Sequence, residues 1–342
     1  MKHQRWPSIE SFAHVKKYIR ESIEKNYESW AFNNKYASKI KLHGTNAAVY
    51  IGINNEIIPQ KRSSFLLEGE DNCGFAAWVK DNETYFKSIR SFIKNNKLLR
   101  NEVLVIHGEW FGKGIQKNVA CSCIDKKAFA VFSIQVKEKE NKDCFYIVEP
   151  SSIEYCLHSD ISPCYILPYY SFIDINFYDS LSIENAKYEM TKQTIEVEDK
   201  DPFIKETFNV EGIGEGLVWY PYIKDYLTMQ NIEKFVFKTK GSKHQNTTNK
   251  TKELIPVDLE KLNSINEFVD KFVTLPRLEQ GLFEACNNSF DIKLIGTFLS
   301  WMSKDIQKES QEELTLSNFD WREVNKYLTA SCKRWYLRQV EN

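Results

Sequence analysis

The segment from Lys39 to Gly52 interrupts a strand-like pattern with residues that could do chemistry. Its sequence is KIKLHGTNAAVYIG, in which Lys41, His43 and Asn46 surround a glycine before apolar residues resume. A lysine that ends a strand before a tight glycine turn can present its amine to a cleft, and small neighbours leave room for a phosphate. Lysine attacks phosphorus only as a neutral amine, and an unperturbed lysine at pH 7 is neutral roughly once in 2,500. The segment therefore predicts a nucleophile at Lys41 in surroundings that favour the neutral amine.

Further cations and carboxylates stand at predicted strand ends downstream. Lys238 and Lys240 are two residues apart in KFVFKTK, so on a strand both side chains point to one face, where they could clamp a triphosphate. Glu109 lies toward the end of the run VIHGEW, and Glu215 opens the run EGLVWYP. Magnesium prefers oxygen ligands and is held together with phosphates that nearby cations neutralise. The combination predicts a magnesium nucleotide site.

The composition limits the class of protein. The chain of 342 residues carries 46 basic and 47 acidic residues, so it is no polycation, and any nucleic-acid contact must come from a local basic patch. The eight cysteines lack the repeated pair spacing of zinc sites, and reduced structural thiols are expected. No segment is as long and apolar as a membrane span, and the N-terminus has no signal-like apolar run. These features predict an intracellular protein, cytoplasmic or nuclear, with no membrane association.

Short β-rich runs broken by turns must position these residues. The runs cover 47–53, 103–107, 129–136, 216–220 and 235–238. Asn54-Asn55 after the first run favours a hairpin turn, and the stretch from Phe75 to Leu99 is typical of a helix. Strands with interspersed helices and no regular βαβ alternation predict an α+β domain with an antiparallel sheet.

The pattern changes after Gly241. The polar segment GSKHQNTTNKTKE predicts a linker or a substrate-facing loop, in which Lys243 and His244 could extend a phosphate site. Apolar residues then recur at helical spacing over 265–273, 295–302 and 324–328. Asp320 begins a DWRE sequence that looks like a capping box at the start of the last helix. The chain therefore ends in a predicted small helical domain.

Taken in order, the motifs resemble the covalent nucleotidyltransferases, specifically the ATP-dependent RNA ligases of the phage RNA ligase 2 type. The resemblance rests on Lys41-x-His43-Gly44-Thr45-Asn46, Lys61-Arg62, Gly108-Glu109-Trp110-Phe111-Gly112-x-Gly114-Ile115-Gln116-Lys117-Asn118-Val119, Val131-Phe132, Glu215-Gly216-x-Val218 and Lys238-x-Lys240. It spans residues 38 to 245. A lone KxHG is weak, but six motifs in family order are specific.

By this resemblance, Lys41 is the nucleophile that takes AMP from ATP, with Mg²⁺ as the metal and Mn²⁺ as its alternative. The implied nucleotide contacts are Arg62 and Glu109 at the ribose and phosphate, Asn46 beside them, Phe132 stacked on adenine, and Lys238 and Lys240 at the phosphates. Glu215 is implied to serve the metal and the lysine, and His43 and Asn46 to act later on the RNA ends. The implied steps are adenylylation of Lys41, transfer of AMP to an RNA 5′-phosphate, and sealing by a 3′-hydroxyl.

The resemblance also implies a division of the chain. Residues 1–245 are expected to form the nucleotidyltransferase (adenylation) domain, and residues 246–342 a helical domain that binds RNA ends, nicked or base-paired. The C-terminal run SCKRWYLRQ mixes cations and aromatic residues, which suits an RNA backbone. Cations in the last turns of a helix are equally expected from the helix dipole alone.

The sequence departs from the family pattern at three positions. Ile40 stands where the phage-type enzyme has a glutamate near the adenine edge, Ser133 where aspartate is frequent, and Tyr220 where a lysine occurs. None of them removes the nucleophile, a carboxylate or the lysine pair, so we expect activity to survive.

Other functions remain open from the sequence. An mRNA-capping-type guanylyltransferase shares the lysine chemistry, but it normally carries an OB-fold, which the helical tail disfavours; a DNA nick ligase is disfavoured for the same reason. A catalytically inactive nucleotidyltransferase fold that binds RNA is the alternative outside enzymes. Phe132 lies in an apolar run and could be a core residue, and His107 is interpreted as structural.

Overall fold

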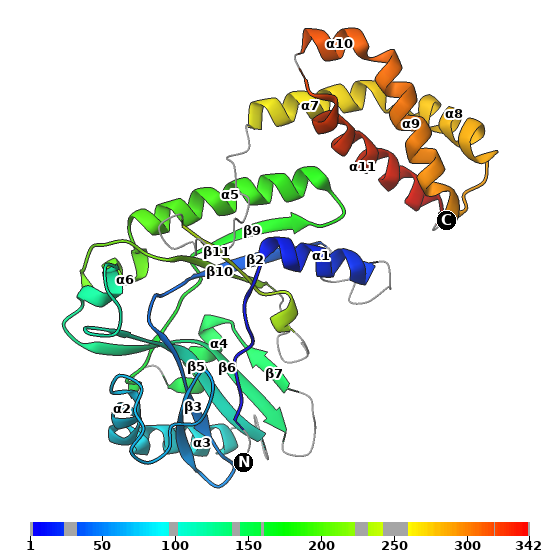
Figure 1. Cartoon of the computed structure of the whole chain (residues 1–342). Coiled ribbons are helices and arrows are strands. Elements are labelled where there is room, and N and C mark those ends of the chain that lie inside the picture. Colours follow the sequence, from blue (N-terminus) through cyan, green and yellow to red (C-terminus); the bar gives the residue numbers. More distant parts are fainter. Residues whose placement is uncertain are drawn as a thin grey trace. The chain divides into compact units, whose positions relative to one another are not determined.

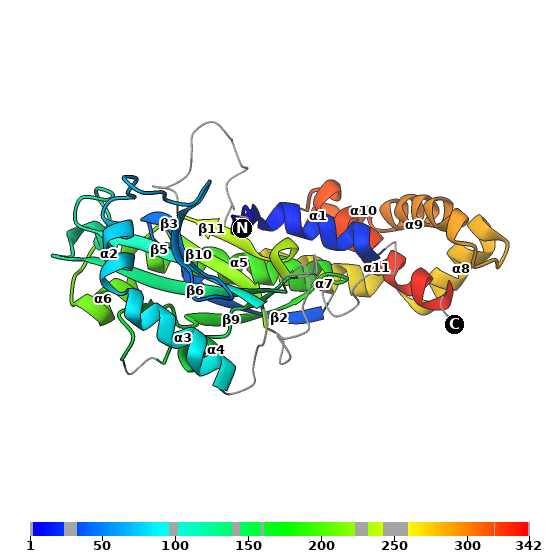
Figure 2. The ribbon, with the colours of Figure 1, turned by 90° about the horizontal axis from the view of Figure 1, so that it is seen from below.

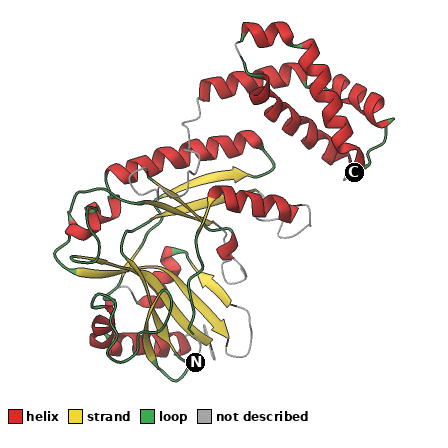
Figure 3. Ribbon diagram, viewed as in Figure 1, coloured by secondary structure: helices red, strands yellow, loops and turns green. Residues whose placement is uncertain are grey.

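The computed structural model describes residues 3–23, 33–95, 102–138, 144–158, 161–222, 232–241, 259–317 and 319–340. The chain divides into two compact units (Figure 1). Unit 1 comprises Met1–Ile175 and Glu189–Thr251, and unit 2 comprises Asn176–Tyr188 and Lys252–Asn342. Unit 1 mixes strands and helices, whereas unit 2 is helical (Figure 3). Lys243 and His244, predicted to extend a phosphate site, lie outside the described residues.

Unit 1 contains two sheets, of which sheet A has five strands. In spatial order they are β1 (Glu10–Ser11), β11 (Phe237–Lys240), β10 (Gly216–Pro221), β2 (Asn33–Ile40) and β9 (Ser171–Asn176). The central strand β10 runs antiparallel to both β11 and β2, while the short β1 is parallel to β11. All six residues of β10 are buried, as expected for a strand between two neighbours and under a helix.

The strands of sheet B lie in the sequence between β2 and β9 of sheet A. Its strands are β4 (Ile57–Lys61), β3 (Thr45–Ile51), β5 (Glu102–Gly112), β6 (Lys127–Glu138) and β7 (Cys144–Ile147), all antiparallel, with β8 (Tyr165–Ile166) parallel to β6. Asn55 has a positive φ of 67° in the turn between β3 and β4, which supports the predicted hairpin there. The register of β5 against β6 shifts between His107 and Gly108. This bulge lies directly before Glu109.

Helices cover both sheets of unit 1. They are α1 (Phe12–Ile23), α2 (Phe75–Asp81), α3 (Glu83–Asn95), η2 (Ala120–Cys123), α4 (Pro150–Leu157), α6 (Pro202–Phe208), η5 (Ile232–Lys234) and the part of α5 (Ser180–Asp199) from Glu189 onward, the earlier part of α5 being assigned to unit 2. Beneath sheet B, α2, α3 and α4 contribute Phe75, Phe86 and Ile153 to its core, and α3 and α4 lie side by side (Figure 2). On sheet A, Phe12 of α1 packs on Phe237, and the Thr194 hydroxyl of α5 lies 2.6 Å from that of Thr239.

Unit 2 is a helical bundle with a core of its own. Its helices are α7 (Leu259–Phe272), α8 (Leu275–Cys286), η7 (Ile292–Leu294), α9 (Ile295–Glu309), α10 (Gln311–Leu316) and α11 (Trp321–Val340). Phe298, Met302 and Leu328 are fully buried in this core. Asp320 precedes α11 and its carboxylate accepts a hydrogen bond from the backbone N–H of Arg322, as the predicted cap requires.

The predicted fold class, α+β with antiparallel sheets and C-terminal helices, is confirmed. The predicted helix from Phe75 to Leu99 is instead two helices, α2 and α3, with Asn82 between them; residues 96–101 are outside the described part. The strand predicted at 235–238 begins at Phe237, because a turn of η5 precedes it. All eight cysteines are free thiols. Within the described residues, no helix has both the length and the apolar character that crossing a membrane demands.

Candidate active site

All nine predicted site residues line one cavity of unit 1, with a volume of about 440 Å³. They are Lys41, His43, Asn46, Arg62, Glu109, Phe132, Glu215, Lys238 and Lys240. Both sheets contribute, since Lys238 and Lys240 lie on β11, while Glu109 and Phe132 lie on β5 and β6. The sequence motifs therefore meet in space.

Lys41 lies in the four-residue link that carries the chain from β2 in sheet A to β3 in sheet B. The backbone N–H of Lys41 donates to the Gly216 carbonyl of sheet A at 2.9 Å. At the other end of the link, the backbone N–H of Gly44 donates to Glu109 Oε1 of sheet B at 3.0 Å. Each end of the link is thus fixed by a different sheet, and the candidate nucleophile stands where the chain crosses between them.

Gly44 has no room for a side chain. A Cβ added there would lie 2.4 Å from the Trp110 carbonyl oxygen and 2.9 Å from the Phe111 Cβ. The Gly44 carbonyl also accepts a hydrogen bond from Gln116 Nε2 at 3.0 Å. The glycine of the KLHGTN motif is therefore required by the close approach of the link to β5.

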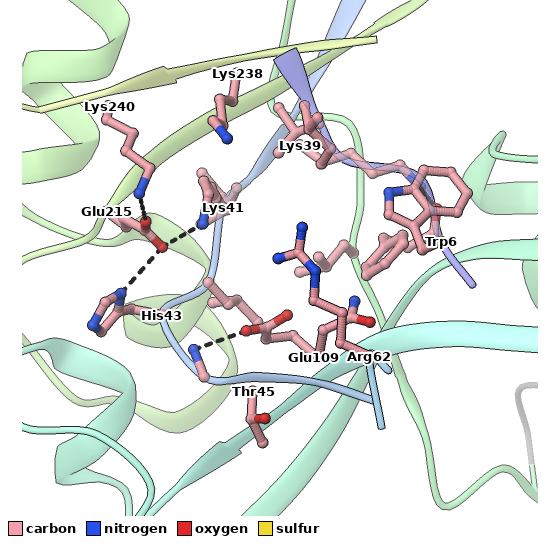
Figure 4. A pocket seen from close by; sticks show the side chains of 18 of the residues that line it. Trp6, Lys39, Lys41, His43, Thr45, Arg62, Glu109, Glu215, Lys238 and Lys240 are labelled. Carbon is pink, nitrogen blue, oxygen red and sulfur yellow. Dashed lines mark hydrogen bonds and ion pairs between the residues drawn. The ribbon is translucent and has the colours of Figure 1, made fainter. Parts of the chain in front are cut away.

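Two lysines and a histidine converge on Glu215, the residue directly before β10 (Figure 4). The Lys41 ammonium donates to Glu215 Oε2 at 2.5 Å, and His43 Nδ1 lies 3.2 Å from the same oxygen. Lys240 Nζ lies 2.6 Å from Glu215 Oε1. Both carboxylate oxygens are thus occupied, and the candidate nucleophile is held in an ion pair.

The surroundings of Glu215 keep it ionised. Burial acts to raise the pKa of Glu215, but the hydrogen bond from His43 and the charges and hydrogen bonds of Lys41 and Lys240 outweigh it and hold the pKa far below the usual range. Gly216 follows with a φ of 144°, and a Cβ there would lie 2.2 Å from the Thr239 carbonyl oxygen. Glycine therefore lets β10 begin against β11 and brings Glu215 to Lys240.

Glu109 differs from Glu215 although it faces the same cavity. Burial raises the pKa of Glu109 to about 7, and the nearby Glu215 acts in the same direction, while Lys41 and the Gly44 N–H oppose the shift. The two carboxylates therefore differ in protonation near neutral pH. Such divergence within one cavity is typical of functional sites.

Lys238 and Arg62 add positive charge on the open side of the cavity. Burial, Lys240 and Lys41 all lower the pKa of Lys238. Arg62 is exposed, directs its guanidinium into the pocket in Figure 4, and donates to the Ser8 hydroxyl at 3.3 Å. This concentration of cations favours an anionic ligand such as a polyphosphate.

Phe132 marks an aromatic end of the cavity. Its ring is partly exposed, packs edge-on against Trp6 at 5.1 Å between ring centroids, and lies nearly parallel to His107 at 6.5 Å. His107 is buried, its Nε2 lies 3.1 Å from the Gln135 side-chain oxygen, which accepts a hydrogen bond, and burial lowers the pKa of His107 to about 4. The imidazole of His107 is therefore neutral at pH 7, and this end of the cavity offers the flat apolar surface that a nucleobase requires.

Trp6 and Lys39 are among the lining residues that the sequence did not predict. Trp6 reaches the cavity from the N-terminal segment before β1, and no local pattern indicates that approach. Lys39 is 1% exposed and donates from Nζ to the Phe132 carbonyl at 3.0 Å. Its burial depends on residues far away in sequence, so no local pattern distinguished it from a solvated strand lysine.

The three departures from the family pattern lie at or beside the same cavity. Ile40 and Tyr220 line it, and Tyr220 is buried beneath the Lys39 ammonium at 5.6 Å from ring centroid to Nζ. Ser133 is buried opposite His107 in the β5–β6 register, and its hydroxyl has no hydrogen-bond partner among the described residues. A lysine is thus present at this end, on β2 rather than β10.

The carboxylates fit a metal only if a ligand supplies further oxygens. No group of three or more histidine, cysteine, aspartate or glutamate side chains in the described residues could hold a metal ion. Magnesium sites of nucleotide enzymes, however, need one or two carboxylates together with substrate phosphates. Glu215 has both oxygens paired with cations, whereas Glu109 uses only Oε1 in hydrogen bonds of the described part. The donor set suits a metal shared with a phosphate.

The fold defines an α+β protein with a lysine-rich cavity where its two antiparallel sheets are joined. The family model described as RNA ligase matches residues 34–240, which is more than half of the chain. The protein belongs to the RNA ligase family. The predicted resemblance is confirmed at that level, and the matched range contains all nine site residues.

Solved structures include similar chains from Naegleria gruberi RNA ligase. One variant with ATP and Mn is 18% identical, with a TM-score of 0.44 over 70% of this chain and 56% of that chain. Another variant with ATP and Mn is 18% identical, with a TM-score of 0.46 over 71% of this chain and 57% of that chain. The present chain thus matches little more than half the length of these ligases. The comparison with curated proteins finds no match.

Proposed function

We propose that the protein is an ATP-dependent RNA ligase that joins a 3′-hydroxyl to a 5′-phosphate through a lysyl-AMP intermediate. The observation that carries the proposal is the convergence of Lys41, His43 and Lys240 on Glu215, in a cavity of a chain from the RNA ligase family. The solved Naegleria ligases with ATP and Mn agree with a nucleotide and a divalent metal, Mg²⁺ or Mn²⁺.

Lys41 is the proposed nucleophile. In the resting site its ammonium is paired with Glu215, so the ion pair must open and the ammonium, which is partly exposed, must pass a proton to water before the amine can attack the α-phosphorus. The new N–P bond forms as the bond to pyrophosphate breaks. Glu215, ionised by its three partners, is the proposed acceptor of hydrogen bonds that orient Lys41, and it is the proposed metal-side carboxylate once Lys41 has moved.

In this proposal, cationic side chains bind the phosphates of ATP. Lys238, Lys240 and Arg62 bind the triphosphate and stabilise the charge that develops during in-line transfer. Glu109 and Asn46 hold the ribose side, paired across β3 and β5 in register. Mg²⁺, when bound, neutralises phosphate charge. Phe132 stacks on adenine, and His43 with Asn46 acts on the RNA ends in the later steps.

The RNA is proposed to be held by both parts of the chain. We assign nucleotide chemistry to residues 1–245 and RNA-end binding to residues 246–342, with nicked or base-paired ends as the substrate. Lys333 and Arg338 of α11 are exposed and can contact phosphates without a cost in buried charge. No helix in the described residues could cross a membrane, and an intracellular location, cytoplasmic or nuclear, belongs to the same proposal.

Covalent labelling tests the central step. The purified protein is incubated with Mg²⁺ and α-labelled ATP or α-labelled GTP, with Lys41→Ala and Lys41→Arg alongside. Label from ATP on the wild type, reduced at least about 1,000-fold in both variants, is expected, because alanine has no amine and arginine cannot lose its proton at neutral pH. Label from GTP would instead support a capping-type guanylyltransferase, and no label from either would support the inactive RNA-binding alternative.

A further inference from the structure

Lys39 is a buried lysine that lines the active-site cavity and has no part in the mechanism above. It lies on β2, two residues before the candidate nucleophile, and its side chain is directed toward the aromatic end. Only 1% of the residue is exposed to solvent. Lysine is rarely buried to this extent without a partner, so its retention needs a reason.

The partners of Lys39 are neutral. Its Nζ donates to the Phe132 carbonyl at 3.0 Å and lies over the rings of Tyr169 at 5.5 Å and Tyr220 at 5.6 Å. In the described part of the chain it forms no ion pair with a carboxylate. Burial lowers the pKa of Lys39 to about 7, although the charge of Glu149 opposes this shift. An ammonium has three donors, and one hydrogen bond leaves two of them for a ligand.

Trp6 supplies a second donor at the same end. Its indole Nε1 is buried and has no hydrogen-bond partner among the described residues, and the residue is 5% exposed. In Figure 4 Trp6 lies on the side of the pocket away from Glu215. Since Trp6 and Lys39 both approach Phe132, the aromatic end has a flat surface with hydrogen-bond donors at its border.

We infer that Lys39 is a specificity residue that reads the nucleobase: its ammonium, anchored on the Phe132 carbonyl, donates a hydrogen bond to a ring nitrogen of adenine stacked on Phe132. The inference rests on the proposed function, because it places the base of ATP at this end. A donor fits adenine, whose N1, N3 and N7 are all acceptors. Guanine carries a hydrogen on N1, so a donor that faces N1 would also reject GTP.

Equilibrium binding tests this contact without depending on catalysis. Calorimetry on the full chain measures the Kd of ATP, of 1-deaza-, 3-deaza- and 7-deaza-ATP, of GTP, and of inorganic tripolyphosphate, for the wild type and for Lys39→Met. Methionine keeps the length of the side chain and removes the charge. ATP is expected to bind about 10- to 100-fold more weakly to the variant, because a hydrogen bond from a charged donor is lost. Tripolyphosphate, which has no base, is expected to bind equally to both.

The deaza analogues distinguish a base contact from a structural role. If Lys39 donates to one ring nitrogen, the analogue that lacks this nitrogen binds the wild type as weakly as ATP binds Lys39→Met, and the variant makes it no worse. The other two analogues are expected to bind Lys39→Met more weakly than the wild type by the same factor as ATP. Lys240→Met is the matched control, expected to weaken tripolyphosphate and all nucleotides together.

Several results would overturn the inference. Equal losses for every analogue, or a loss for tripolyphosphate as well, would give Lys39 a structural role in shaping the cavity. Tighter binding of GTP than ATP by the wild type would overturn adenine as the base. A protein that binds ATP with this pattern but forms no lysyl-AMP would leave the base contact standing while the proposed function fails.

Discussion

Two carboxylates of one cavity have pKa values that are shifted in opposite directions. Glu215 is paired with Lys41, Lys240 and His43 and stays ionised, whereas burial of Glu109 raises its pKa to about 7. The pair therefore offers one fixed negative charge and one carboxyl group that exchanges a proton near neutral pH. Binding of a cation close to Glu109 is expected to release that proton.

The raised pKa of Glu109 predicts a pH-dependent cost in stability. A carboxyl whose pKa is about 7 folded and 4.5 unfolded lowers the free energy of unfolding as pH rises between those values. Glu109→Gln removes this slope, so without ligand the variant should gain about 1–2 kcal/mol over the wild type at pH 8 and little at pH 5, after allowance for partial exposure. Urea denaturation at both pH values measures the difference.

Glu211→Gln is the control with the opposite sign. Hydrogen bonds and charge from Lys200 and Lys205 lower the pKa of this exposed carboxylate to about 2, so its stabilisation is present above pH 4.5 and is lost as pH falls toward 2. The variant should therefore be less stable than the wild type at neutral pH. If Glu109→Gln followed the same course as Glu211→Gln, the raised pKa of Glu109 would be wrong.

At this scale the sequence predicted which residues meet but not how they pair. Lys41, Glu215 and Lys240 could be chosen from motif order, because each motif is local. Lys39 could not be distinguished from a solvated strand lysine, since its burial depends on Tyr169 and Tyr220, which are far away in sequence. Long-range burial of this kind leaves no periodic signal.

Among the elements, the link between β2 and β3 determines the site. Its two ends are hydrogen-bonded to different sheets, and Gly44 touches the backbone of β5. The sequence predicted β3, β5, β6, β10 and β11 from their apolar runs. It gave no signal for β9 or α5, because β9 is an edge strand with polar residues and α5 has a weakly patterned surface.

Gly44→Ala should disrupt this link. The new methyl group would meet the Trp110 carbonyl at 2.4 Å, and we expect about 1–3 kcal/mol of destabilisation together with at least a tenfold loss of lysyl-AMP formation. Gly296→Ala is the matched control, since a Cβ there meets nothing within 4 Å in helix α9, and alanine favours a helix by about 0.5–1 kcal/mol. Thermal melts and labelling of both variants check the pair. Similar losses in the two would refute the steric argument.

The whole molecule consists of two units with separate cores. The core of unit 1 surrounds Phe86, Phe129 and Val131, and that of unit 2 surrounds Phe298 and Met302. Units with separate cores can perform separate functions. Labelling with ATP measures the nucleotide chemistry proposed for residues 1–245, and joining of RNA also depends on the RNA-end binding proposed for residues 246–342.

A chain that ends at Thr251 should retain the first reaction and lose much of the last. Label from ATP is expected within about threefold of the full chain, while joining of nicked RNA falls about tenfold or more as phosphate contacts are lost. The salt dependence of RNA binding should become shallower. A circular dichroism melt serves as the control for folding, and equal loss of labelling and joining in a folded truncated chain would contradict the assignment of RNA-end binding to residues 246–342.

The ion pair between Lys41 and Glu215 joins residues 174 positions apart in the sequence. Protein synthesis proceeds from the N-terminus, at about 5–20 residues per second, so roughly 9–35 s separate the addition of these two residues on the ribosome. During that interval Lys41, the candidate nucleophile, lacks Glu215 and Lys240, which line the same cavity. A chain that ends before Glu215 therefore lacks the carboxylate that pairs with Lys41, and the site described here cannot form in it.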